Sequence, residues 1–504
     1  MYIEPNTNIR LLKNVPLDNT YQHTYYFTDK TSQSNHFLGY TKHILTEQTY
    51  QRSRLGVSRV GIKAEDLFDC NYMMFQNTNF GSKWFYAFIN SVEYVNNTVS
   101  EIRFEIDVMQ TWFFDYELRD SFVQREHSST DSIGDNLIPE NLELGEYVTD
   151  DFDGTQKMGD YKIVIGATVE EDGYKVTGGH YAGIYSGLYL NVFDNYEDAN
   201  TWLADVTKKG KSDGIVSVFM MPSAFITEIG SSVNHYELSK TKQYNSIGGY
   251  VPKNNKLFTH PYNFLYVTNL DGNYAEFRYE YFSEGSCTFG LTGDFSCNPS
   301  VVLYPRNYKG VVANYDEKMC LGGFPQCSWN TDAFKAWLAQ NSGALAVSTF
   351  STVANGVLTS MVNPIRGATN LVSNVGGILA QVQAHAIMPP QAKGGGGSTT
   401  MTALKIKDFA FMHKHITKEF AMIIDRYFHM FGYATNKVKV PNRSVRSKWN
   451  YVKTIGCNAY GSVPTDDMSK IKSIYDSGIT FWKTSATVGK YTDSDGSLLS
   501  NSIL

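Results

Sequence analysis

The feature that most constrains this chain is a long stretch with almost no charge. Residues 336–392 contain a single charged side chain, Arg366. Within this stretch, apolar residues recur at i, i+3, i+4 and i+7 in two runs, the spacing of one apolar helix face. Pro364 and Gly367 lie between the two runs and favour a turn. The sequence therefore predicts a helical hairpin here.

The polar residues of the hairpin are uncharged, and its length is close to that of a membrane-spanning segment. Its apolar residues are Leu345, Val347, Phe350, Val353, Val357, Leu358, Met361, Val362, Ile365, Leu371, Val372, Val375, Ile378, Leu379 and Val382. Its turn and hinge residues are Pro364, Arg366 and Gly367, followed by Gly394, Gly395, Gly396 and Gly397. Residues 344–362 would extend about 28 Å as a helix, close to the hydrocarbon thickness of a bilayer. Frequent Ser, Thr, Asn and Gly argue against a permanent transmembrane helix. Two interpretations stay open: a segment held in protein and later offered to lipid, or a buried hairpin in an ordinary core.

The composition predicts a large, mainly β protein. Of 504 residues, 42% are hydrophobic, 14% aromatic and 19% charged, which supports sizeable cores in about three domains. Tyr (34) and Phe (30) are abundant and favour strands. The net charge of −6 implies no general attraction to nucleic acid. The first residues lack the pattern of a secretory signal, and six scattered cysteines are expected to be reduced.

An aromatic β-hairpin is predicted near the N-terminus. Apolar and polar side chains alternate along residues 83–94 and 102–108, and an Asn-rich turn at Asn96 and Asn97 lies between the two runs. The side chains expected to face the core are Ile102, Phe104, Ile106 and Val108, and those expected to face outward are Glu101, Arg103, Glu105 and Asp107.

Further elements are predicted along the chain. Strands are expected over residues 161–169, 183–192, 215–221, 264–268, 274–281 and 405–413, with a helix over residues 199–208. A second helix is expected after Thr417, a suitable N-cap, and Gly432 is expected just past its end. One face of this helix would carry Phe420, Ile424, Tyr427, Phe428 and Phe431.

Candidate chemical sites are few, and no metal or cofactor is expected. His413 and His415 would share one face of a strand and could bind a metal, but no acidic or thiol partner lies nearby in the sequence. Cys287, Cys297, Cys320 and Cys327 could form a zinc site, although buried thiols fit their spacing better. His385, within the uncharged stretch, could act as a proton switch, although a tolerated histidine is the simpler interpretation.

A basic run without acidic residues contains Lys437, Lys439, Arg443, Arg446, Lys448 and Lys453. It could bind phosphate or line a DNA conduit. Alternation with Val438 and Val440 favours a solvated strand face or a subunit contact instead.

Several segments resemble one protein family. Residues 8–11, 74–77, 81–88, 104–112 and 121–127 near the start are similar to the tail knob, or distal tail tube, protein of small short-tailed Bacillus-type phages. So are residues 450–452, 471–482 and 489–491 near the end. The similarity covers both ends, about half of the chain, whereas residues 166–335 match by position only. The chain is also shorter than expected for the family.

The resemblance implies a fold and a role. It implies a mainly β chain with some α, in which a β-barrel-like tail-tube domain is split between residues 1–165 and 399–504. A β-rich knob would occupy residues 166–335, and the hydrophobic loop residues 336–398. The subunits would form a homo-oligomeric ring, expected to be a hexamer, in the virion tail after assembly in the host cytoplasm.

In the family, the hydrophobic loops plug the tube and then form a pore in the host membrane for genome ejection. The implied partners are other tail proteins (the proximal tube, and a tip or wall-degrading protein), the host cytoplasmic membrane and genomic DNA in the lumen. Two alternatives remain: a module that adsorbs to wall glycans, and a wall hydrolase, for which no enzyme signature is present.

Overall fold

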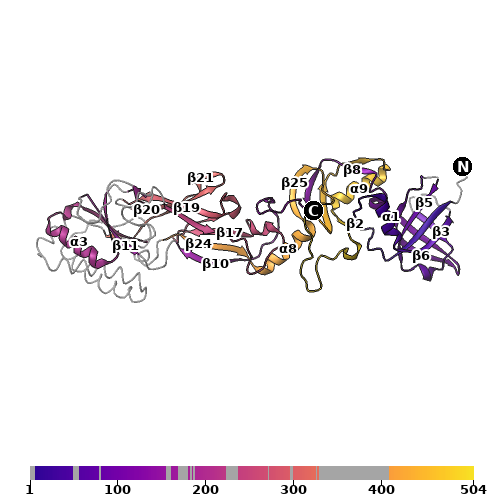
Figure 1. The fold of residues 1–504 in the computed structure, drawn as a ribbon, viewed down its shortest axis with the longest axis horizontal. Helices are drawn as coiled ribbons and strands as arrows, with labels where there is room; N and C mark the ends of the chain where they lie inside the picture. Colours follow the sequence, from indigo (N-terminus) through magenta and orange to yellow (C-terminus); the bar gives the residue numbers. More distant parts are fainter. Residues whose placement is uncertain are drawn as a thin grey trace. The chain divides into compact units, whose positions relative to one another are not determined.

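The computed structural model describes residues 6–48, 56–78, 81–154, 161–168, 180–181, 184–185, 188–222, 236–270, 272–295, 299–324, 326–327 and 408–504. These residues are mainly β with some helix, as predicted (Figure 1). The chain divides into two compact units. The first contains Met1–Leu144, Tyr250–Leu257 and Lys418–Leu504, and the second contains Gly145–Gly249 and Phe258–Thr417.

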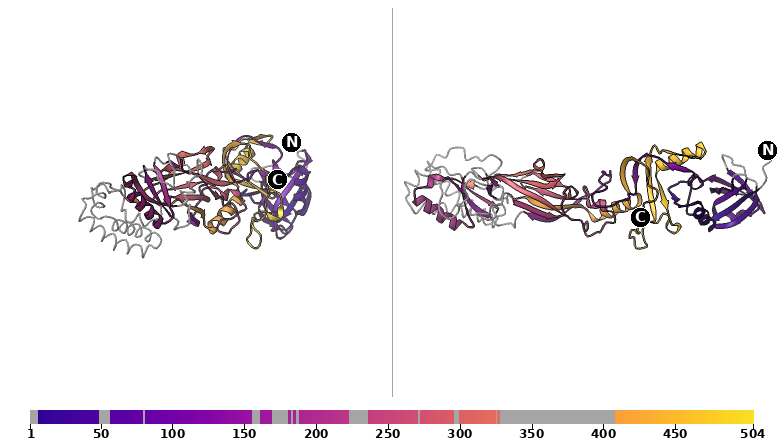
Figure 2. Two further views of the ribbon diagram at one scale, coloured as in Figure 1. Left: turned by 60° about the vertical axis from the view of Figure 1, so that its left-hand side comes forward. Right: turned by 45° about the horizontal axis from the view of Figure 1, so that its top comes forward.

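The first unit contains a six-stranded antiparallel sheet from the N-terminal part of the chain. In sheet order its strands are β3 (Thr41–Gln48), β1 (Thr7–Lys13), β5 (Cys70–Asn77), β6 (Phe85–Asn96), β7 (Val99–Ile106) and β4 (Gly56–Val60). Both views of Figure 2 show these strands, in indigo and purple, side by side. Both faces of the sheet are covered: on β5, Met73 and Phe75 join one apolar cluster, and Tyr72 and Met74 join another. A strand buried on both faces needs the unbroken apolar run seen here.

The predicted hairpin is present as β6 and β7, which pair antiparallel around the turn between Asn96 and Val99. Ile102 and Phe104 face the core as expected. The prediction is wrong for Asp107, which is only 1% exposed. The chain leaves the strand there to form α2 (Val108–Thr111), and the Asp107 carboxylate caps that helix by accepting a hydrogen bond from the Gln110 amide.

A second sheet in this unit combines strands from both ends of the chain. Its order is β2 (His23–Tyr25), β28 (Ile479–Trp482), β26 (Trp449–Ile455), β9 (Ser121–Glu126) and β25 (Tyr433–Lys439). A small ladder joins β27 (Ala459–Gly461) to β8 (Tyr116–Leu118). Besides α2, the described part of the unit contains the helices α1 (Lys30–Leu38), α8 (Lys418–Phe431) and α9 (Thr465–Ser477), with 3-10 turns at Ala64–Leu67, Asn255–Phe258 and Ser485–Thr487.

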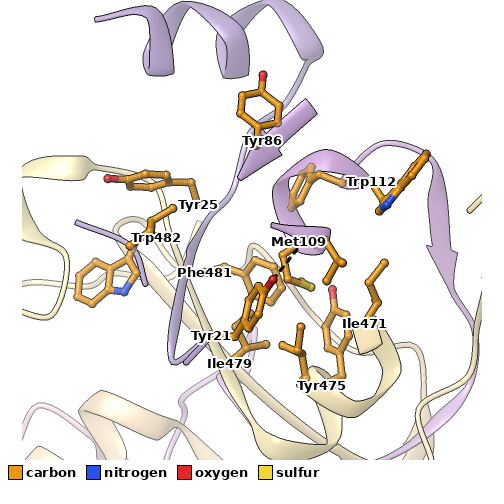
Figure 3. Close-up of a cluster of buried hydrophobic side chains, with 14 of the residues drawn as sticks. Tyr21, Tyr25, Tyr86, Met109, Trp112, Ile471, Tyr475, Ile479, Phe481 and Trp482 are labelled. Carbon is orange, nitrogen blue, oxygen red and sulfur yellow. Dashed lines mark hydrogen bonds between the residues drawn. The ribbon is translucent and has the colours of Figure 1, made fainter. Parts of the chain in front are cut away.

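The largest core of the first unit is aromatic and also combines both ends of the chain. Figure 3 shows Tyr21, Met109 and Trp112 from the N-terminal part packed with Ile471, Tyr475 and Phe481 from the C-terminal part. Two hydrogen bonds reinforce the contact: Trp112 Nε1 donates to Asp467 Oδ2 at 2.8 Å, and the hydroxyls of Tyr116 and Tyr475 lie 2.9 Å apart. Buried Tyr and Trp side chains need such partners for their polar atoms. Neither end of the chain completes this core alone.

The described part of the second unit contains three sheets. One contains β10 (Tyr147–Gly154), β24 (Ala410–Ile416), β17 (Asn263–Thr268) and β18 (Tyr274–Phe277), and another β14 (Tyr189–Phe193), β11 (Tyr161–Ala167), β15 (Ile215–Pro222) and β23 (Gln326–Cys327). The third runs β12 (His180–Tyr181), β13 (Ile184–Tyr185), β19 (Ser286–Asp294), β20 (Ser300–Tyr308) and β21 (Val311–Ala313), with β16 (Tyr236–Thr241) on β19 and β22 (Met319–Leu321) on β20. 3-10 turns lie at Ser212–Gly214, Tyr279–Tyr281 and Tyr315–Glu317.

Most predicted elements of this unit exist with shifted ends. The single strand expected over residues 183–192 is wrong: β13 pairs with β19 in the third sheet, whereas β14 pairs with β11 in the second. The helix α3 (Tyr196–Lys208) begins three residues earlier than predicted and buries Ala199, Leu203 and Val206, at i, i+4 and i+7, on the second sheet. The strand expected over residues 274–281 ends at Phe277, where its pairing with β17 stops. The strand expected over residues 405–413 runs instead to Ile416, because β24 stays paired with β10 as far as Tyr147. The strands β10 and β24, which the sequence assigned to the split tail-tube domain, thus lie in the second unit (Figure 1).

Candidate functional site

The residues predicted to act on a membrane lie outside the described residues. This holds for the apolar hairpin residues from Leu345 to Val382, the turn at Pro364, Arg366 and Gly367, the Gly394–Gly397 hinge and His385. Among the residues that the structure does describe, no helix is both long and apolar enough to cross a membrane.

The described site with the densest polar chemistry is a buried junction in the first unit, around the segment Tyr250–Leu257. This segment belongs to the first unit, although the residues on both sides of it belong to the second. Asp425, on α8, is fully buried and fixes the segment. Its carboxylate accepts hydrogen bonds from the Tyr250 hydroxyl at 2.6 Å, the Lys253 amide at 2.9 Å, and the Asn254 amide and side chain at 3.0 and 2.7 Å.

Asp131 supports the next residues of the segment. It accepts a hydrogen bond from the Tyr433 hydroxyl, and its backbone carbonyl accepts one from Asn255 Nδ2 at 2.6 Å. Burial raises the pKa of Asp131, and the Tyr433 hydrogen bond opposes that shift. The segment is therefore held by groups from α8, from β25 and from the chain after β9.

A buried ion cluster closes the junction. The Glu140 side chain is 1% exposed and pairs with Arg125, and with Lys256 Nζ at 2.7 Å. Glu140 also accepts a hydrogen bond from the Ala434 amide at 2.8 Å, and Lys256 donates to the Ile138 carbonyl at 2.7 Å. Burial lowers the pKa of Lys256, and the Glu140 carboxylate opposes that shift. One carboxylate thus holds two cations, and these contacts specify how β9, β25 and the 250–257 segment meet.

A pocket of about 450 Å³ lies beside this cluster. Its lining residues are Gln124, Arg125, Pro139, Glu140, Asn141, Leu142, Tyr427, Phe431, Ala434, Asn436, Tyr451 and Lys453. They come from the strands β9, β25 and β26, from α8 and from residues 139–142. The volume is within the range of small-ligand sites.

The basic run is only partly a solvated face. Lys437 and Val438 are exposed as predicted, and Val438 is 71% exposed. The prediction is wrong for two arginines: Arg446 is buried, and Arg443 packs its guanidinium over the rings of Phe113 and Tyr116. The reason is that residues 441–448 form a loop between β25 and β26, where strand alternation no longer applies.

The histidine pair on β24 lies on one face, as predicted. The two rings are 5.3 Å apart, and both are buried. His413 Nδ1 lies 2.8 Å from the Tyr279 hydroxyl, and His415 Nε2 lies 2.8 Å from Asp150 Oδ2. Within the described residues no three potential metal ligands come together, so the pair carries no argument for a metal.

The cysteines Cys70, Cys287, Cys320 and Cys457 are free thiols. The expected burial holds for Cys287 and is wrong for Cys320, which is exposed on β22.

Sequence reasoning missed the junction. One local signal was present: Asp425 lies within the apolar pattern of α8, next to Ile424 and three residues before Phe428, where a charge needs a partner. Its partners, more than 170 residues away, could not be inferred from that signal.

Known proteins match along nearly the whole chain. The family model of the C-terminal domain of the tail knob protein gp9 of Bacillus phage phi29 matches residues 228–495, and that of the caudoviral major tail protein N-terminus matches residues 5–117. The tail knob protein gp9 of Bacillus phage B103 is 26% identical over 585 aligned positions, which cover 96% of this chain and 98% of the relative. The phi29 protein is 24% identical with the same coverage. An alignment longer than the 504 residues of this chain means that these relatives carry insertions, in line with the expected shortness.

A solved structure shares the fold. The tail knob protein gp12 of bacteriophage C1 superposes with a TM-score of 0.62 at 15% identity, covering 99% of this chain and all of that one. The gp9 family model alone covers more than half of this chain. The chain therefore belongs to the family of the phi29 tail knob protein gp9.

Proposed function

We propose that this chain is the subunit of a distal tail tube and knob whose hydrophobic loop first plugs the tube and then forms a pore in the host membrane. That it is a structural protein of the virion tail follows from its family. The observation that carries the finer proposal is the low-charge stretch at 336–392, which is long enough to span a bilayer and too polar to insert permanently.

The proposal divides the chain into four segments. Residues 1–165 and 399–504 form the tube, residues 166–335 the knob and residues 336–398 the loop, and β10 and β24 carry the chain between tube and knob. The shared sheet and core of the two chain ends support a tube domain split in this way. The subunits form a ring, a hexamer in this proposal, that joins other tail proteins after assembly in the host cytoplasm and lets genomic DNA pass.

Two states describe the loop. In the plugged state the apolar stripes of the loops bury against one another inside the ring. In the released state the same stripes face lipid, and the Ser, Thr and Asn stripe lines a water-filled pore. The free energy for insertion comes from apolar side chains at about 0.3–0.6 kcal/mol each near the membrane centre.

Dye release from liposomes tests the pore. The full-length protein should release dye, and a variant that lacks residues 342–392 should not. A sharper test compares two variants that each carry one added charge. Leu358→Asp, on the apolar stripe, should abolish dye release, because a charge facing lipid costs about 2.5–3.5 kcal/mol per subunit. Thr359→Asp, on the polar stripe, should retain dye release. Release that survives the deletion would refute the pore.

A further inference from the structure

The pocket beside the ion cluster offers polar groups that no other part of the described chain uses. The side chains of Gln124, Asn141, Asn436 and Lys453 line it, and none has a side-chain hydrogen bond or ion pair with any residue that the structure describes. A side-chain amide presents both a donor and an acceptor, as does a hydroxyl group. Three amides around one cavity thus suit a ligand with several hydroxyls.

Three lining residues of the pocket are aromatic, and the Arg125 guanidinium lies 4.7 Å from the ring centroid of one of them, Tyr427. Tyr427 and Phe431 lie 5.3 Å apart between ring centroids, and Phe431 and Tyr451 lie 5.0 Å apart, with interplanar angles of 57° and 75°. Rings packed against one another at these angles form a continuous wall and leave no parallel slot for a nucleobase. Such a wall can pack against the C–H face of a sugar ring.

The charges of the pocket favour a negative ligand. Arg125 and Lys256 share the single Glu140 carboxylate, so the ion cluster keeps a net positive charge. The Lys453 ammonium is left as the unpaired charge among the described lining residues, on β26 beside Arg125 of β9. The backbone pairing of β9 with β25 and β26 holds the strands that carry Gln124, Asn436 and Lys453 next to one another.

We propose that this pocket binds a sugar unit that carries a phosphate or carboxylate group. The sugar hydroxyls form hydrogen bonds with the side-chain amides of Gln124, Asn141 and Asn436. The sugar ring packs on the aromatic wall, and the anionic group forms an ion pair with Lys453. The proposal is independent of the pore, since every residue involved lies in the first unit and none in the loop.

Calorimetric titration of the full-length protein tests this proposal. Four probes separate the contributions: glucose 6-phosphate, glucuronic acid, glucose and inorganic phosphate. At least one anionic sugar should bind at least about ten-fold more tightly than glucose, because it gains one charge-assisted hydrogen bond with Lys453. Which of the two binds identifies the anionic group.

Variants connect the binding to the pocket. Lys453→Gln should lower the affinity for the anionic sugar to that for glucose. Asn141→Ala, at an exposed residue, should lower the affinity for the anionic sugar and for glucose alike. Lys437→Gln, on an exposed lysine that does not line the pocket, should change nothing. Thermal unfolding of each variant verifies that it is folded. The proposal is overturned if no sugar binds, if Lys453→Gln leaves the preference intact, or if inorganic phosphate binds as tightly as the anionic sugar.

Discussion

At the scale of single residues, the first unit depends on carboxylates that are buried together with their donors. Asp107, Glu126 and Asp425 are each at most 2% exposed. Glu126 pairs with Lys439 and accepts a hydrogen bond from the Asn442 amide at 2.9 Å. A buried carboxylate is tolerable only while these donors remain in place, so loss of one partner costs more than the pair contributes.

Asp425→Asn should destabilise the first unit strongly. The amide places an NH₂ group where the carboxylate accepts hydrogen bonds, so at least one buried donor loses its acceptor. We expect a loss of about 2–4 kcal/mol in the free energy of unfolding. Urea unfolding followed by the fluorescence of the buried Trp112, Trp449 and Trp482 measures it. The exposed Asp120→Asn is the matched control and should be neutral. Equal unfolding midpoints for the two variants would contradict the role given to Asp425.

Asp107 should make stability fall as the pH rises. Burial raises the pKa of Asp107 to about 6, from an ordinary value of 3.8. Since the unfolded chain releases this proton at lower pH than the folded protein, the stabilisation is complete below about pH 4 and is lost as the pH rises through 6. The loss amounts to at most about 3 kcal/mol, at 1.36 kcal/mol for each pKa unit.

Asp107→Asn isolates this effect. Asparagine keeps the N-cap acceptor and has no charge to desolvate. Relative to the natural protein, the variant should therefore gain stability between pH 4 and pH 7, because other titrating groups cancel in the difference. Unfolding free energies at four pH values provide the comparison. A difference that stays constant over this range would show that the Asp107 pKa is not raised.

At the scale of elements, the end of α8 illustrates how a local signal and a close contact coincide. Gly432, predicted to follow the helix, has φ +66°, and its amide donates to the Phe428 carbonyl at 2.7 Å. A Cβ at this position would lie 2.1 Å from the Glu126 carbonyl oxygen of β9. The glycine is therefore required twice, by the left-handed backbone and by the approach of another strand.

Gly432→Ala and Gly456→Ala should separate these two requirements. Gly456 has φ +68° with no atom near the position of a Cβ, so alanine there should cost only about 1–2 kcal/mol. Alanine at Gly432 carries the same backbone cost and also forces α8 and β9 apart, so its loss should exceed that of Gly456→Ala by at least about 2 kcal/mol. The same urea titration measures both variants. Similar losses of unfolding free energy in the two variants would mean that β9 moves away from the added methyl group at little cost.

At the scale of the whole molecule, the first unit requires both ends of the chain. A fragment of residues 1–144 lacks Trp449, Ile471, Tyr475, Phe481 and Trp482, which are all buried in the shared core. We expect this fragment to expose the apolar face of its sheet and to show no cooperative thermal unfolding. Co-expression with residues 145–504, which supply the rest of this core and the 250–257 segment, should restore protection from protease. A fragment that unfolds cooperatively by itself would show that the six-stranded sheet is a domain of its own.

The sequence alone determined those features that depend on neighbouring residues. The β6–β7 hairpin, the helix α3 and the glycine after α8 follow from alternation, helical spacing and left-handed backbone, all of which act over a few residues. The motifs at both chain ends likewise identified the family, and through it the role in the tail.

Only the tertiary structure decided which distant groups meet. It turned Asp107 inward and buried Arg446. It also packed Arg443 over two core rings and brought Glu140, Lys256 and Asp425 into one junction. The partners of Asp425 lie more than 170 residues away, and those of Glu140 include Lys256, 116 residues away. Residue patterns do not encode such pairings, although hydrogen bonds to them are what a buried charge needs. The pocket beside the junction arises from the same long-range pairing, since its walls come from segments that meet only in the folded chain.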